Sequence, residues 1–111
     1  MIIKVNTTES PLLEFNLQGK YKYIELQLET HIPLSLFKVY SRVSKDSSYV
    51  QLLTDFNSPS GVLVDVYNNP IGLTDSSSYI LFNVEGKKYF KITTASNTST
   101  YVNASYFLTK V

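Results

Sequence analysis

The sequence predicts an all-β domain, an antiparallel β-sandwich of about eight or nine strands that is jelly-roll-like or immunoglobulin-like. Three observations lead to this prediction. Apolar and polar residues alternate with period two in several segments, as they do in strands that bury one face. Clusters of turn-forming residues separate these segments at intervals of about 8–12 residues. No strand–helix–strand rhythm occurs, which argues against a parallel sheet.

The clearest alternation lies in residues 22–29, 61–68, 79–84 and 87–94. Because successive side chains of a strand point to opposite faces, each of these segments presents one apolar face to a core. The residues expected in the core include Ile24, Leu26, Leu28, Phe37, Val39, Val62, Val64, Ile80, Phe82, Phe90 and Ile92.

Shorter segments also fit strands, namely residues 2–6, 12–17, 49–54 and 105–111. Residues 36–43 fit either a helix or an interrupted strand, because their apolar residues match both spacings. Their β-branched and aromatic content favours the strand.

Turn signals divide the chain without marking a second domain. Glu85-Gly86 separates two alternating runs by two residues, so residues 79–94 are predicted to form a hairpin. The chain has 111 residues and no linker-like segment, so residues 1–111 are expected to form a single domain.

Composition excludes several classes of function. The net charge of +1 gives no strong attraction for nucleic acid or for an anionic membrane. The chain has no cysteine, so neither disulfides nor a thiolate metal site are expected. The apolar run in residues 1–5 is too short for a signal peptide, and no run approaches the roughly 20 apolar residues of a membrane-spanning helix. A soluble protein without cofactor is therefore expected.

Catalytic residue sets are also missing, so the chain is expected not to be an enzyme. His31 is the only histidine, and a catalytic role would need a nucleophile and an orienting partner beside it. Glu25 and Glu29 would lie roughly 13 Å apart on one strand, farther than the paired carboxylates of glycosidases. The aspartates lack the spacing of a calcium loop, although a calcium site built from several loops would leave no local motif.

The tyrosines are the candidate binding residues. The chain has nine tyrosines. We select five of them as candidates, most of which fall opposite the clearest apolar faces of the predicted strands. Exposed tyrosines suit protein interfaces and sugar-binding platforms, but aromatic residues also favour strands for packing reasons alone. Stacking of single-stranded nucleic acid on them would need a basic groove, which the charge balance does not supply. The selected tyrosines are Tyr21, Tyr23, Tyr40, Tyr67 and Tyr89.

The layout of strands and turns from Phe37 onward is similar to a known group of proteins. Ser44-Lys45-Asp46 is followed by a Tyr49 strand, and Gly86 is followed by Tyr89-Phe90-Lys91-Ile92. This pattern resembles the small β-sandwich domains of tailed-phage virion proteins, including head decoration and fibre-attachment proteins. The resemblance covers about two thirds of the chain. It implies a virion component, made in the host cytoplasm, that docks on capsid or fibre subunits as a homo-oligomer.

Two functions follow as expectations. The first is a non-enzymatic assembly protein that adheres to other structural proteins through outward tyrosines and an exposed strand edge. The second is a carbohydrate-binding module with a platform such as Tyr21, Tyr23 and Tyr40.

Overall fold

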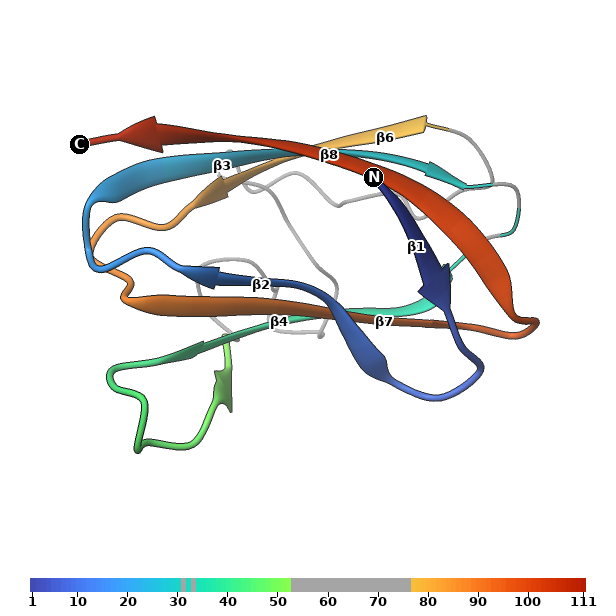
Figure 1. Ribbon diagram of the computed structural model, residues 1–111, viewed down its shortest axis with the longest axis horizontal. Helices are drawn as coiled ribbons and strands as arrows, with labels where there is room; N and C mark the ends of the chain where they lie inside the picture. The colour runs from blue at the N-terminus through green and yellow to red at the C-terminus, as the bar shows by residue number, and fades with distance from the viewer. Residues whose placement is uncertain (31, 33, 53–76) are drawn as a thin grey trace.

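The computed structural model describes residues 1–30, 32, 34–52 and 77–111. Within these ranges the chain forms two four-stranded antiparallel sheets. We call them sheet A, with the order β1-β8-β3-β6, and sheet B, with the order β2-β7-β4-β5. Figure 1 shows the two sheets stacked as layers, so the predicted antiparallel β-sandwich is confirmed. The strands are β1 (Ile2–Val5), β2 (Ser10–Asn16), β3 (Tyr21–Thr30), β4 (Leu34–Arg42), β5 (Val50–Gln51), β6 (Ser77–Asn83), β7 (Tyr89–Ser96) and β8 (Thr100–Lys110).

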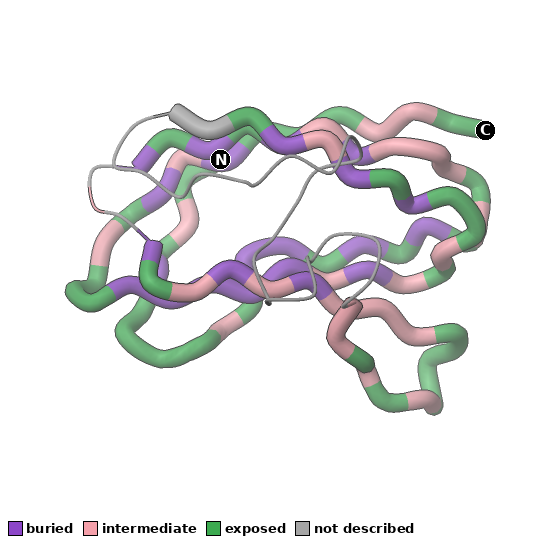
Figure 2. Tube along the Cα trace, turned by 180° about the vertical axis from the view of Figure 1, so that it is seen from behind, coloured by how far each residue is buried: buried purple, intermediate pink, exposed green. Residues whose placement is uncertain are grey.

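The core lies between the two sheets, where buried residues of both layers face each other (Figure 2). The ring of Phe82 in sheet A stacks on Phe37 at 6.3 Å and contacts Phe90 at 5.4 Å between centroids, which ties it to sheet B. Every predicted core residue in the described ranges is buried. Val62 and Val64 lie outside those ranges.

Residues 36–43 follow the strand alternative, because β4 covers most of this segment and no helix forms there. The predicted strand at residues 61–68 lies outside the described ranges. The last strand is longer than expected, since β8 begins at Thr100 rather than at residue 105. The described residues include no helix long and apolar enough to cross a membrane.

The predicted hairpin at residues 79–94 is wrong. Strand β6 pairs with β3 in sheet A, whereas β7 pairs with β2 and β4 in sheet B. The Glu85-Gly86 turn therefore crosses from one layer to the other, with Gly86 at a φ of +80° and the Lys87 N–H donating to the Val84 carbonyl at 2.9 Å. This crossing lets Phe82 and Phe90 face the same core from opposite sides, whereas a hairpin would have placed both strands in one layer.

Candidate binding surfaces

The structure divides the selected tyrosines that it describes between the two sheets. Tyr21 and Tyr23 belong to β3 of sheet A, whereas Tyr40 and Tyr89 belong to β4 and β7 of sheet B. Tyr67 lies outside the described ranges. Because the outer faces of stacked sheets point in opposite directions, Tyr23 and Tyr40 do not share a platform.

Tyr21 does not lie on an outer face. The pairing of β3 with β8 shifts register between Tyr21 and Tyr23, as at a β-bulge. A bulge adds one residue to a strand and so changes which face the next side chain occupies. Tyr21 is consequently half-buried and packs against the core cluster.

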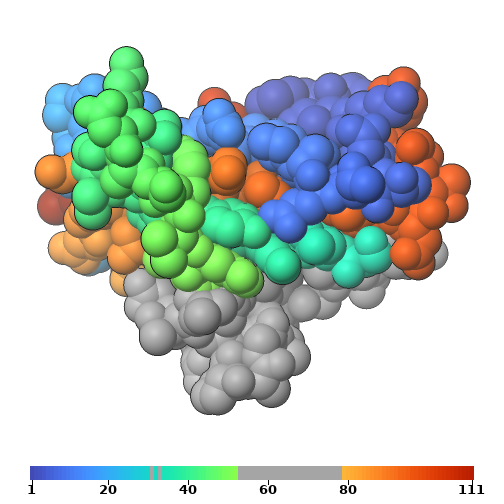
Figure 3. All heavy atoms as spheres, turned by 90° about the horizontal axis from the view of Figure 1, so that it is seen from below, coloured from blue at the N-terminus to red at the C-terminus, as the bar shows by residue number. Residues whose placement is uncertain are grey.

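The outer face of sheet B gathers Tyr40 and Tyr89 with Tyr49, a tyrosine that the sequence analysis did not select. Strands β2, β7, β4 and β5 lie side by side on this face (Figure 3). The guanidinium carbon of Arg42 lies 4.4 Å from the Tyr49 ring centroid and 5.1 Å from that of Tyr89. The Lys91 Nζ lies 4.3 Å from the Tyr49 centroid and 5.2 Å from that of Tyr40. Cations and rings therefore alternate across the sheet.

The strand register explains this alternation. Tyr40 lies opposite Lys91, and Arg42 lies opposite Tyr89. Each strand thus carries a tyrosine and a cation two residues apart, and antiparallel pairing places unlike groups together. The Tyr-x-Arg and Tyr-x-Lys spacings are the sequence signal for this arrangement, but they become informative only when the pairing is known.

Glu9 completes the network on sheet B. Its Oε2 accepts hydrogen bonds from the Tyr40 hydroxyl at 2.6 Å and from the Thr93 hydroxyl at 2.7 Å, and Lys38 lies 3.9 Å from Oε1. The hydrogen bond from Tyr40 is the largest cause of the lowered pKa of Glu9, and the bond from Thr93 acts in the same direction. Burial, followed by the bond to Glu9, raises the pKa of Tyr40. The polar groups of this face are thus largely engaged with one another.

A hollow of about 400 Å³ lies beside this network, at the turn between β4 and β5. Its lining combines the apolar side chains of Val43, Val50 and Leu52 with serine residues and Arg42. The Nε of Arg42 is buried without a hydrogen-bond partner among the described residues, while its Nη1 donates to the Lys45 carbonyl at 3.1 Å. Lys87 also lines the hollow, whose surface is apolar for the most part.

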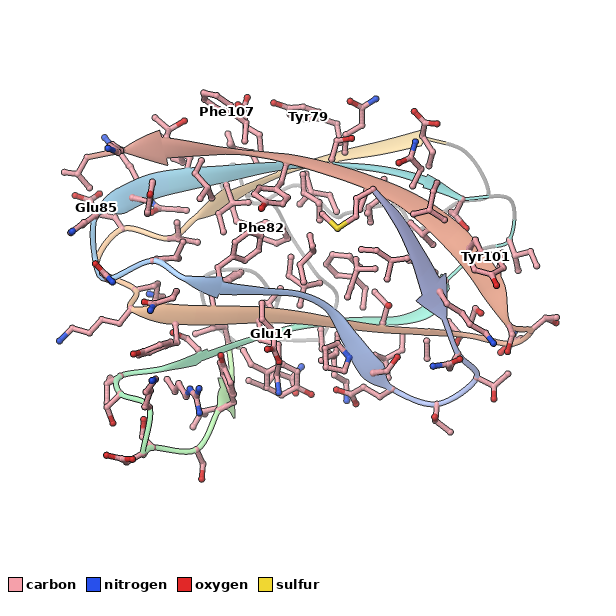
Figure 4. All side chains as sticks on the ribbon, in the orientation of Figure 1. Glu14, Tyr79, Phe82, Glu85, Tyr101 and Phe107 are labelled. Carbon is pink, nitrogen blue, oxygen red and sulfur yellow. The ribbon has the colours of Figure 1, made fainter. Side chains whose placement is uncertain are left out.

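The outer face of sheet A is different, because large apolar side chains lie exposed on it. They come from β1, β6 and β8, and their exposed fractions are 66% for Ile2, 64% for Tyr79, 62% for Tyr101 and 64% for Phe107. Figure 4 shows Phe107 and Tyr79 pointing away from the space between the sheets, in contrast to Phe82. We call these four residues the sheet A patch.

Polar side chains of β3 run through the sheet A patch. Glu25 lies between Phe107 of β8 and Leu81 of β6, and Gln27 lies opposite Tyr79. The Tyr79 hydroxyl donates a hydrogen bond to Glu25 Oε1, and this bond is the main cause of the raised pKa of Tyr79. Within the ranges that the structure describes, no cation lies over the rings of Tyr79 or Phe107.

The described residues contain no group of three or more His, Cys, Asp or Glu side chains that would hold a metal ion. Glu25 and Glu29 lie on the outer face of β3, and His31 is outside the described ranges. The chain matches no family model, no curated protein and no solved structure. The outer faces of the two sheets are therefore the surfaces from which function can be argued.

Proposed function

We propose that this chain is a non-enzymatic assembly protein that docks on other structural proteins through the sheet A patch. The supporting observation is that Ile2, Tyr79, Tyr101 and Phe107, from three different strands, lie exposed on one face. Exposed apolar side chains gathered on one face are typical of protein interaction sites, and aromatic residues are enriched at interface centres.

The polar groups of the patch indicate what the partner presents. Glu25, Gln27 and Glu29 run along β3 between the aromatic residues, and Lys4 lies at the β1 side opposite Tyr101. A partner surface with apolar pockets flanked by lysine, arginine or amide groups would complement this face. Such a partner is a folded protein surface rather than a nucleic acid.

The virion context is part of the same proposal and is supported by the resemblance of residues 37–108 to tailed-phage β-sandwich domains. Under this proposal the partners are capsid or fibre subunits, and the chain decorates a capsid or anchors a fibre. Docking on a repeating lattice favours a symmetric oligomer, because each copy then meets an equivalent surface.

Carbohydrate binding is the alternative, and the geometry of sheet B argues for it less well. Tyr40, Tyr49 and Tyr89 lie close together, but each ring has a cation over at least one of its two faces. Sugars stack on ring faces, so Arg42 and Lys91 compete with a glycan for these surfaces. On sheet A, Lys22 lies 5.5 Å from the Tyr23 ring centroid, but among the described residues no cation lies over the exposed rings of Tyr79, Tyr101 and Phe107.

The test is co-expression of the chain with tailed-phage capsid and fibre proteins, followed by co-sedimentation with assembled particles. We expect Phe107→Ser to weaken particle binding roughly tenfold, as for a central interface aromatic. Val43→Ser is the matched control, because Val43 is 74% exposed but lies at the end of β4, away from the sheet A patch.

Two results would contradict the proposal. Particles that bind the Phe107→Ser variant as well as the wild type would exclude the sheet A patch as the docking site. Saturable binding on a glycan array, lost in Tyr40→Ala and retained in Phe107→Ser, would instead establish the carbohydrate-binding alternative.

A further inference from the structure

Strand β8 is covered on one side along only part of its length. Strand β1 pairs with Thr100–Asn103, and the Ala104 N–H donates to the Met1 carbonyl at 2.8 Å. Figure 1 shows β1 beside only one half of β8. From Tyr106 to Lys110, the described part of the chain pairs β8 with β3 alone. We call this stretch the open edge of β8.

Burial changes at the point where β1 ends. Val102 and Ala104 face the core and are fully buried. Tyr106 faces the same way and contacts the Phe15 ring at 5.0 Å between centroids, yet it is 45% exposed. Tyr106 is therefore left exposed at the open edge. An additional strand there would cover Tyr106 as β1 covers Val102 and Ala104.

The direction of the backbone groups follows from two hydrogen bonds. The Ala104 N–H points toward β1, whereas the Val111 N–H donates to the Lys20 carbonyl on the β3 side at 3.0 Å. Because alternate residues of an antiparallel strand direct their N–H and C=O groups to alternate sides, Tyr106, Leu108 and Lys110 direct theirs away from β3. The open edge thus offers three donors and three acceptors in one line.

We propose that a second copy of this chain pairs with the open edge, β8 against β8, about a two-fold axis that passes between the two Leu108 residues. In this register Leu108 lies opposite Leu108 of the second copy, and Tyr106 lies opposite Lys110. The two copies of sheet A then form one continuous sheet. Antiparallel pairing of the three residues makes about six hydrogen bonds between the copies.

This register is the one that uses all the free backbone groups. Shifting it by two residues one way brings Lys110 opposite Ala104, whose N–H already bonds Met1. Shifting it by two the other way moves Tyr106 past Lys110, the last residue of β8. Shifts by one residue place core-facing and outward side chains on the same face, which disrupts both cores.

Side chains are also complementary in this arrangement. Phe107 lies opposite Thr109 of the second copy on the outer face, a favourable aromatic and β-branched pair. The Lys110 ammonium lies beside the Tyr106 ring of the second copy, so the two lysines are kept apart and each gains a cation–π contact. The axis makes every contact occur twice, as in an isologous dimer.

The edge of sheet B that β2 forms is less suited to pairing with a second copy. Strand β2 carries Pro11, which has no N–H, and its pairing shifts register between Pro11 and Leu13. Proline and bulges are the usual devices that protect an edge against pairing with another chain. The open edge of β8 has neither, and its pairing with β3 shifts register only at Tyr21. Self-pairing through β2 is thus disfavoured, whereas the open edge of β8 carries no such protection.

Self-pairing goes beyond the proposed docking function, because it requires no other protein. The first test is analytical ultracentrifugation of the purified chain over a range of concentrations. We expect a dimer, and Leu108→Pro should raise its Kd about tenfold or more because each copy loses one intermolecular donor. Among the described residues, no strand pairs with the Leu108 N–H, so proline removes little from the fold. Leu108→Ala is the control, since it shortens the side chain and keeps the N–H.

A second variant keeps the inference testable if Leu108→Pro does not fold. Tyr106→Lys places a lysine opposite Lys110 of the other copy at both ends of the pairing and should abolish dimerisation. Val43→Lys is its control, because Val43 is 74% exposed and lies at the end of β4 in the other sheet. Amide hydrogen exchange should show Tyr106, Leu108 and Lys110 protected in the wild type and fast in Tyr106→Lys.

A wild-type chain that sediments as a monomer at every concentration would overturn the inference. So would a dimer that survives both Leu108→Pro and Tyr106→Lys. Neither result would affect the docking proposal, which is decided by particle binding. Because Phe107 also lies opposite Thr109 of the second copy, Tyr79→Ser on β6, away from the open edge, separates docking from self-pairing. Conversely, a dimer with the expected variant behaviour would stand even if the chain bound no particles.

Discussion

The outer faces of sheets A and B use aromatic residues in opposite ways. On sheet B, Tyr40, Tyr49 and Tyr89 are engaged by Arg42 and Lys91 of the same molecule. On sheet A, the rings of the patch are more than half exposed. An outward aromatic side chain on a strand is thus compatible with an internally stabilised surface and with a docking surface.

Cross-strand neighbours explain the difference. Register places Lys91 opposite Tyr40 on sheet B, whereas on sheet A it places Glu25 opposite Phe107 and Gln27 opposite Tyr79. Lys4 lies opposite Tyr101 on sheet A, but among the described residues no cation lies over the Tyr101 ring. A cation over a ring gains about 0.5–1 kcal/mol at an exposed site, but a carboxylate or amide gains nothing from the ring face. Aromatic residues on sheet A therefore keep surface free for a partner.

The largest expected effect should be similar for the two sheets, because both sheets contribute side chains to the same core. Phe82→Ala in sheet A and Phe90→Ala in sheet B should each lower the free energy of unfolding by about 3–5 kcal/mol. The two rings are 5.4 Å apart, so the double variant should lose less than the sum of the single losses. Urea denaturation measures all three. Strict additivity would contradict a shared core.

A smaller effect should separate the two faces. Arg42→Met keeps most of the side chain but loses its cation and its hydrogen bond to Lys45, so the free energy of unfolding should fall by about 1–2 kcal/mol. Phe107→Ser on sheet A should change it by less than about 0.5 kcal/mol. Chemical denaturation of both variants tests the contrast. Equal losses would mean that the two faces do not differ in internal stabilisation.

The smallest expected effect concerns pH and is confined to sheet B. Hydrogen bonds hold the pKa of folded Glu9 below its ordinary value of 4.5, so its contribution to stability is present above that value and is lost as pH falls through the folded pKa. Glu9 is partly exposed, and we expect a contribution below about 1 kcal/mol. Glu9→Gln should therefore be less stable than the wild type at neutral pH, and the difference should shrink in acid. A pH-independent difference would contradict the role of the carboxylate.

The sequence predicted the elements whose pattern is local. Alternation of Ile24, Leu26 and Leu28 indicated a half-buried strand, and all three are buried in β3. The β-branched and aromatic residues of 36–43 favoured the strand that β4 forms. Such patterns are informative because the side-chain period of a strand is independent of its partner.

Features that depend on a partner strand were not predictable in this way. Glu85-Gly86 indicated a hairpin, but a short turn serves equally to cross between layers, and only packing of both flanking strands on one core decides this. Tyr21 was selected as a candidate binding residue, but a register shift in its pairing with β8 leaves it half-buried against the core. Tyr49 was overlooked because it precedes β5 and joins the network only when Arg42 and Lys91 are brought beside it.

By itself, the sequence determined that the chain pleats into strands and that one half of each strand is apolar. The tertiary structure decided which strands are neighbours, and hence which tyrosines meet cations and which part of β8 lacks a neighbour. The physical reason is that alternation is carried by adjacent residues, whereas register is a property of two segments far apart in the chain.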